Sequence, residues 1–152
     1  MFTILIVDDS PLFRKSLRDT LQGRFPHVAI EEASDGVEGL KKVDTCKPQM
    51  IFMDIHLPGE NGLKLTRRIK NDYSSTCIAV VTINNLPEYQ KAALECGADH
   101  FACKCSWNRD DIFTLVESVL SRQGYNLLGI ATDNRVHLTG AAFNQELNDN
   151  VF

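Results

Sequence analysis

Two short apolar runs end in aspartate: FTILIVDD at residues 2–9 and MIFMD at residues 50–54. Four to six apolar residues in a row, bounded by polar ones, are typical of a strand that is covered on both faces of a parallel sheet. Further strand-like runs follow along the chain, and segments with helical periodicity lie between them. This alternation predicts an α/β protein with a parallel sheet.

The alternation continues through five strand–helix units, which end near residue 122. We expect the strands at residues 2–7, 28–33, 50–53, 77–82 and 99–103. The expected helices begin after Ser10, after Asp35, after the loop LPGENG at residues 57–62, at Pro87 and near Asn108. Residues 1–122 are therefore predicted to form one domain of five parallel strands and five helices.

Apolar residues at helical spacing mark the expected core-facing stripes of the first two helices. In the first helix the stripe consists of Leu12, Phe13, Leu17 and Leu21. In the second helix it consists of Val37, Leu40 and Val43.

Residues 123–152 differ in character from the preceding units. They are rich in asparagine, contain glycines at 124, 129 and 140, and have only scattered apolar residues. A short apolar patch at Leu127, Leu128 and Ile130 could dock on the domain. We expect a flexible or loosely packed C-terminal tail rather than a separate effector domain.

The overall charge and hydropathy exclude several function classes. With 16 basic and 20 acidic residues the net charge is −4, which does not favour contact of this chain with nucleic acid. No run approaches the roughly 18 apolar residues of a membrane helix, and the N-terminus has no basic leader. We therefore expect a cytoplasmic protein without membrane contact.

Five cysteines are present, and Cys103 and Cys105 flank Lys104 in a C-x-C arrangement. An odd number of cysteines without an export signal indicates reduced thiols. A metal or redox site at the C-x-C pair has to be considered, but zinc sites usually draw four ligands from paired clusters, and no second cluster follows. We expect ordinary buried or edge thiols.

Acidic residues stand where predicted strands end. Asp8 and Asp9 follow the first strand and Asp54 follows the third, while Thr82 ends the fourth and Lys104 follows the fifth. In the common strand order 2-1-3-4-5 the first and third strands are neighbours, so the three carboxylates would converge at the carboxyl edge of the sheet.

Three converging carboxylates raise one another's pKa unless a positive charge joins them. Mg²⁺ prefers oxygen ligands and binds through carboxylates together with phosphate oxygens. Lys104 and Thr82 would supply a charge and a hydroxyl to the oxygens of a transferring phosphoryl group. One carboxylate could then attack phosphorus and form an acyl phosphate.

The motifs ILIVDDS, MDIHLPGENG, VVT and FACK, in this order, resemble the receiver domain of bacterial two-component response regulators over residues 2–122. The chain is most similar to receivers that precede helix-turn-helix output domains. The resemblance implies a flavodoxin-like, doubly wound sheet of order 2-1-3-4-5. It also implies Mg²⁺-dependent phosphotransfer from a histidine kinase or phosphotransfer protein, followed by slow self-catalysed hydrolysis, without turnover of a separate substrate.

Individual roles follow from the same resemblance. It implies that Asp54 is the phosphoacceptor, that Asp8, Asp9 and Asp54 hold Mg²⁺, and that the main-chain carbonyl of His56 completes the metal ligands.

The resemblance also implies a conformational switch. Thr82 would move toward the phosphoryl group, Lys104 would pair with it, and Phe101 would be the rotating aromatic. The surface from the fourth to the fifth helix would change, and it could form a homodimer.

Three features depart from the family pattern. Cys105 replaces the usual proline after Lys104, so either a costly cis bond is retained or the loop is rebuilt. Ile83 replaces a small residue, which predicts a longer-lived phosphorylated state. His56 and Asn84 occupy positions along the route of the attacking water.

Two other functions stay open on the sequence alone. An aspartate-nucleophile phosphatase would need a second aspartate two residues after the nucleophile, where this chain has His56. A receiver-like scaffold would keep the acidic pocket but act independently of phosphorylation.

Overall fold

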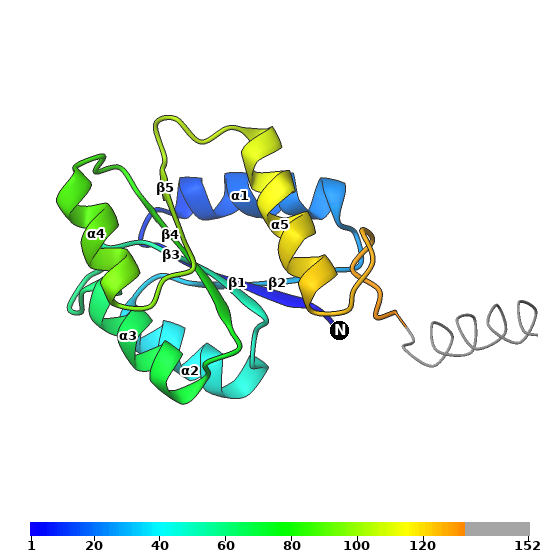
Figure 1. The fold of residues 1–152 in the computed structure, drawn as a ribbon, viewed down its shortest axis with the longest axis horizontal. Helices are drawn as coiled ribbons and strands as arrows, with labels where there is room; N and C mark the ends of the chain where they lie inside the picture. Colours follow the sequence, from blue (N-terminus) through cyan, green and yellow to red (C-terminus); the bar gives the residue numbers. More distant parts are fainter. Residues whose placement is uncertain (133–152) are drawn as a thin grey trace, which may run out of the picture.

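The computed structural model of the chain describes residues 1–132. Strands and helices alternate along it (Figure 1). The strands are β1 (Thr3–Val7), β2 (Ala29–Ala33), β3 (Met50–Met53), β4 (Cys77–Thr82) and β5 (His100–Cys103). The helices are α1 (Pro11–Arg24), α2 (Gly36–Cys46), α3 (Gly62–Asp72), α4 (Pro87–Glu95) and α5 (Arg109–Arg122). The predicted strands and helices are confirmed.

The five strands form one parallel sheet in the order β2-β1-β3-β4-β5, as predicted. Val7 at the end of β1 lies opposite Met53 at the end of β3. The next residues continue the pairing, because the Asp54 N–H donates to the Val7 carbonyl at 2.9 Å. The register therefore brings the carboxyl ends of β1 and β3 to the same level.

Both faces of the sheet are covered (Figure 1): α1 and α5 lie on one face, and α2, α3 and α4 on the other. The strand β1 shows why its sequence is continuously apolar. Ile4 and Ile6 pack in the α1/α5 layer, while Leu5 and Val7 pack in the opposite layer. Each such side chain contributes roughly 1.5–3 kcal/mol when it is fully buried.

The helix starts follow the capping chemistry of the sequence. The Ser10 hydroxyl accepts a hydrogen bond from the Phe13 N–H at 3.2 Å, and the Asp35 carboxylate accepts one from the Glu38 N–H at 2.8 Å. These contacts satisfy backbone donors that have no partner inside the helix. Within residues 1–132, no helix is both long enough and apolar enough to cross a membrane.

The predicted core stripes were wrong at two positions. Leu12 and Val37 are 79% and 78% exposed. In α2 the buried face runs through Gly36, Gly39 and Val43 instead. A Cβ atom at Gly36 would lie 2.9 Å from the Leu65 side chain, so this face needs glycine where a stripe of apolar side chains is expected.

After α5 the chain makes a compact turn against the amino ends of the strands. The Tyr125 ring packs edge-on against Phe2 with centroids 5.0 Å apart, and Tyr125 forms a β-bridge with Ala131. The apolar patch that was expected to dock is not buried against the domain, since Leu127, Leu128 and Ile130 are each about half exposed. The predicted tail covers residues 123–152, of which residues 133–152 lie outside the described part, and the division into domain and tail stays a prediction.

Gly62 at the start of α3 passes directly beside the functional edge of the sheet. A Cβ atom there would lie 1.8 Å from the Asp54 carbonyl oxygen, while a Cβ at Gly23 in α1 would meet nothing within 4 Å. We expect Gly62→Ala to lower the free energy of unfolding by about 1–3 kcal/mol or more. The matched change Gly23→Ala should raise it by about 0.5–1 kcal/mol. Urea unfolding followed by circular dichroism measures both, and equal effects would contradict the close approach at Gly62.

Candidate functional site

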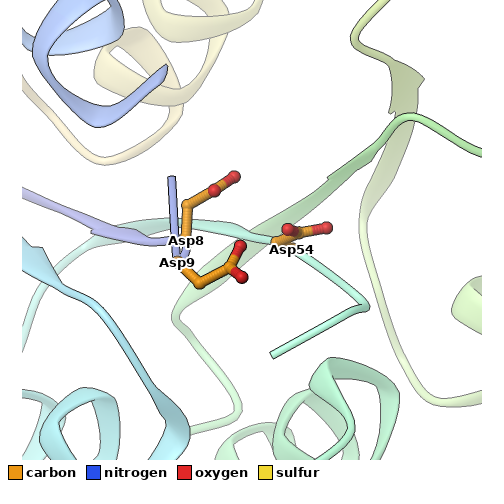
Figure 2. Close-up of side chains that lie close together, drawn as sticks. All are labelled: Asp8, Asp9 and Asp54. Carbon is orange, nitrogen blue, oxygen red and sulfur yellow. The ribbon is translucent and has the colours of Figure 1, made fainter. Parts of the chain in front are cut away.

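Three carboxylates meet where β1 and β3 end (Figure 2), as the sequence predicted. One oxygen from each of Asp8, Asp9 and Asp54 lies within 4.8 Å of the other two. Asp8 and Asp54 are buried, with 1% and 6% exposure, whereas Asp9 is exposed. Two of the three carboxylates are thus largely, though not wholly, shielded from bulk water.

Backbone groups hold the two buried carboxylates in place. The Ser10 N–H donates to Asp8 Oδ1 at 2.9 Å, and the His56 N–H donates to Asp54 Oδ1 at 3.4 Å. The Arg14 guanidinium donates to the main-chain carbonyl of Asp8 at 2.6 Å. The two N–H groups orient the carboxylates, and Arg14 holds the main chain at Asp8.

Lys104 supplies a cation that faces this cluster. Its Nζ atom lies 2.6 Å from Asp8 Oδ2 and 3.5 Å from Asp54 Oδ2. The Lys104 N–H donates to the Thr82 carbonyl at 2.9 Å, so the lysine is anchored where β4 and β5 end.

A second contact on Lys104 was not predicted. Its Nζ atom lies 4.2 Å from the centroid of the Phe13 ring. Such a cation–π contact is worth about 0.5–2 kcal/mol. Phe13 was assigned to the core stripe of its helix, and its position one turn after the Ser10 cap was the available signal that it borders the site.

The environment of Asp54 disfavours a free negative charge. Burial raises the pKa of the Asp54 carboxyl above its usual value, and the neighbouring Asp8 carboxylate raises it further. Lys104 and the His56 N–H lower the pKa, but they do not cancel the effect of burial. The carboxylate would therefore gain from a further positive charge, whether on a cation or on an incoming group.

A hollow of about 390 Å³ opens above these groups. Its walls include Asp9, Asp54 and Lys104, and its rim includes Phe13, His56 and Ile83. The Ile83 side chain is 66% exposed and stands at the opening. The volume admits a phosphoryl group together with water molecules.

The residues at the rim of the hollow contact one another. The His56 Nε2 atom lies 2.6 Å from the Asn84 amide nitrogen, which donates when Nε2 carries no proton. The His56 ring also packs edge-on against Tyr89, with centroids 5.7 Å apart. The Asn84 N–H donates to the Thr82 hydroxyl at 3.4 Å. The structure thus links His56 and Asn84, two of the residues that depart from the family pattern.

Neither of the two predicted switch residues lines the hollow beside the carboxylates. Thr82 is fully buried at the end of β4. Phe101, on β5, is half-buried against the layer of α2, α3 and α4, and it lines a second hollow of about 340 Å³ with Trp107. Their movement on phosphorylation stays a prediction.

The loop after Lys104 is rebuilt rather than strained. All peptide bonds of residues 1–132 are trans, including the bond between Lys104 and Cys105. The Ser106 and Trp107 N–H groups donate to the Cys103 carbonyl at 3.2 and 3.1 Å, so the chain turns at once after β5.

A doubly wound parallel sheet with an aspartate cluster and a lysine at its carboxyl edge places the chain among α/β domains with an acidic pocket. The family model described as "Response regulator receiver domain" matches residues 4–117, and the chain belongs to this family. The resemblance seen in the sequence is confirmed.

Curated relatives and solved structures agree with this assignment. The chain is 40% identical over 97 residues to protein-glutamate methylesterase/protein-glutamine glutaminase 3 of Hahella chejuensis, covering 62% of this chain and 28% of that protein. It is 30% identical over 102 residues to the nitrate/nitrite response regulator NarL of Escherichia coli K12, covering 67% of this chain and 47% of that protein. The match therefore spans less than half of each of these relatives.

A solved CheY-like receiver domain protein from Methanospirillum hungatei superposes with a TM-score of 0.74 at 27% identity, covering 81% of this chain and 96% of that one. The fold predicted from the sequence is thus the fold of solved receiver domains.

We expect Asp54→Asn to raise the free energy of unfolding at pH 7 by on the order of 1 kcal/mol, because it removes a buried charge beside Asp8. Asp54 has a raised pKa in the folded state, so the native protein binds a proton that the unfolded chain has released above pH 3.8. The contribution of Asp54 to the stability of the unchanged protein therefore falls as pH rises through this window, and the advantage of the variant should disappear below it.

Urea unfolding without divalent cations measures this difference. The pH is varied from about 3 to about 7, a range that includes the usual carboxyl pKa of about 4. The control Asp72→Asn changes an exposed aspartate of α3. It should shift stability by less than about 0.5 kcal/mol throughout. A destabilised Asp54→Asn protein at pH 7 would contradict the account of the site.

Proposed function

We propose that the chain acts as a response-regulator receiver in which Asp54 takes up the phosphoryl group. The observation that carries this proposal is the position of the Lys104 ammonium between the buried Asp8 and Asp54 carboxylates, beside an open hollow that Lys104 and Asp54 line. An acceptor carboxylate there is reachable from solvent, and its cationic partner is already in place.

We further propose that Asp8, Asp9, Asp54 and the main-chain carbonyl of His56 hold Mg²⁺. The donor set supports this, because it offers only oxygen atoms, three of them within 4.8 Å of one another. Within residues 1–132, Lys104 is the only side-chain cation paired with these carboxylates. When bound, Mg²⁺ would neutralise charge that develops on the phosphoryl oxygens.

The chemical step uses the chain's own groups. An oxygen of Asp54 attacks phosphorus of a phosphohistidine, a P–O bond forms, and the P–N bond to the imidazole breaks. Lys104 then moves its ammonium from Asp8 toward the new phosphoryl oxygens, since these carry about −1.5 to −2 charge. Hydrolysis of the acyl phosphate later returns Asp54 to its starting state.

Receiver domains take their phosphoryl group from histidine kinases, and we propose a histidine kinase or phosphotransfer protein as the donor here. The reaction would turn over no separate substrate, and we place it in the cytoplasm. All five cysteines lie in the described residues and are free thiols, which supports a reducing compartment.

The response would be a change of the surface formed by α4, β5 and α5. Thr82 is drawn to the phosphoryl group, and Phe101 turns inward from the edge of its hollow. Leu86 and Leu94 are each about half exposed beside this surface, which supports its use for a protein partner or a homodimer. With a net charge of −4, we propose no nucleic acid contact by this chain itself.

Incubation with a small phosphodonor such as acetyl phosphate tests the acceptor. We expect one phosphoryl group per chain by intact mass spectrometry, strongly reduced when EDTA removes Mg²⁺. Asp54→Asn should abolish the signal, and the exposed-aspartate control Asp72→Asn should retain it. An unmodified chain in Mg²⁺ would support a phosphorylation-independent scaffold instead, and steady release of phosphate from phosphate esters would indicate a phosphatase.

Ile83 offers a test of the phosphoryl lifetime. Because this exposed side chain stands at the mouth of the hollow, it should hinder the attacking water. We expect Ile83→Ala to speed dephosphorylation about fivefold, the effect of roughly 1 kcal/mol on the barrier. The control Leu128→Ala removes a similarly exposed side chain at the opposite end of the sheet and should leave the rate unchanged. An unchanged rate in Ile83→Ala would show that Ile83 does not shield the site.

A further inference from the structure

Two cysteines flank Lys104, and both point to the same neighbour. The Sγ atoms of Cys103 and Cys105 each lie 3.7 Å from the main-chain carbonyl oxygen of Ile83. The Lys104 side chain between them points instead to Asp8. The two thiols therefore converge on one side of the chain while the lysine occupies the other.

The spacing of the two cysteines along the backbone is compatible with a disulfide. Two residues at this spacing in an extended strand have Cα atoms roughly 6.6 Å apart. This is close to the upper limit of about 6.8 Å for a disulfide. The chain is not extended here, because the Ser106 N–H donates to the Cys103 carbonyl at 3.2 Å, and the turn shortens the separation.

The local chemistry gives the two thiols different roles. Hydrogen bonds from the Cys105 N–H and thiol lower the pKa of Cys103, and the N–H and hydroxyl of Ser106 lower it further. The pKa of Cys105 is raised by its hydrogen bond to Cys103. Cys103 is thus suited to attack as a thiolate, and Cys105 to resolve the product.

Small oxidants can reach both groups. Cys103 is only 6% exposed, but it lines the hollow of about 340 Å³ beside Phe101 and Trp107. Cys105 lies on the surface. A peroxide could enter this hollow without entering the hollow of about 390 Å³ beside Asp54, here called the acidic hollow.

We propose that Cys103 and Cys105 form a redox-sensitive dithiol, and that its oxidation to a disulfide by a peroxide suppresses phosphorylation of Asp54. The inference rests on the proposed function of Asp54, because Lys104 lies inside the ring that the disulfide closes. Closing the ring moves both sulfur atoms from the Ile83 carbonyl toward each other and shifts the Lys104 backbone. Lys104 and Ile83 both line the acidic hollow, so its geometry changes.

The reaction balances with hydrogen peroxide as the oxidant. The Cys103 thiolate attacks one peroxide oxygen, the O–O bond breaks, and a sulfenic acid and hydroxide form. The Cys105 sulfur then attacks the sulfenic sulfur, and its proton leaves with the displaced hydroxide as water. In sum, two thiols lose two electrons and two protons, and one peroxide gives two waters.

The full chain is treated with hydrogen peroxide, and its disulfides are located by alkylation and peptide mapping. We expect a bond between Cys103 and Cys105, with a rate of Asp54 phosphorylation by acetyl phosphate about tenfold lower. Dithiothreitol should restore the rate. Cys105→Ser should be phosphorylated normally and should not respond to peroxide, whereas the control Cys46→Ser should respond like the unchanged chain.

Free Cys103 and Cys105 after a dose that oxidises other thiols of the chain would overturn the proposal. So would a disulfide that leaves the rate unchanged, or a Cys105→Ser protein that stays sensitive. If the reduced chain takes no phosphoryl group on Asp54, the proposed function itself fails, and peptide mapping alone still reports on the dithiol.

Discussion

The bridge from Lys104 to Asp8 and Asp54 is the interaction on which the arrangement of the site depends. Three carboxylates converge because parallel strands end at one edge, and this crowding opposes folding unless a cation offsets it. A buried ion pair of this kind adds little net stability, since desolvation opposes the attraction between the charges. The ion pair matters because of where it lies. It joins an ammonium at the ends of β4 and β5 to the carboxylates at the ends of β1 and β3, so a change of charge at the carboxylates acts directly on Lys104.

The backbone around the bridge leaves little freedom. Gly62 passes so near the Asp54 carbonyl that no Cβ fits, and Arg14 holds the Asp8 carbonyl from the first helix. Both contacts act on main-chain atoms, so the chain that carries the carboxylates stays in place when their charged partners change. Such preorganisation suits a group that must exchange partners without refolding its surroundings.

The sheet and the carboxylate cluster could be predicted from sequence because they follow from simple periodicity. Apolar runs located the strands, and the residues after them had to meet at one edge. The stripes of α1 and α2 were partly misassigned because Gly36 and Gly39 carry no side chain for a hydropathy pattern to detect. The contacts from Phe13 to Lys104 and from Tyr125 to Phe2 join residues far apart in the chain. Their formation depends on tertiary packing, which periodicity does not encode.

The turn around Tyr125 also determines at which end of the sheet the chain continues after α5. It packs on Phe2, just before β1 begins, and the Thr132 hydroxyl donates to the Gly124 carbonyl. Residue 132 therefore lies near the amino ends of the strands, whereas the aspartates follow their carboxyl ends. A fluorophore or affinity handle attached at residue 132 would stand a full strand length from the acidic hollow. Labels at this end of the sheet would leave the approach of a phosphodonor unobstructed, and the molecule could be tethered to a surface with its reactive edge facing solution.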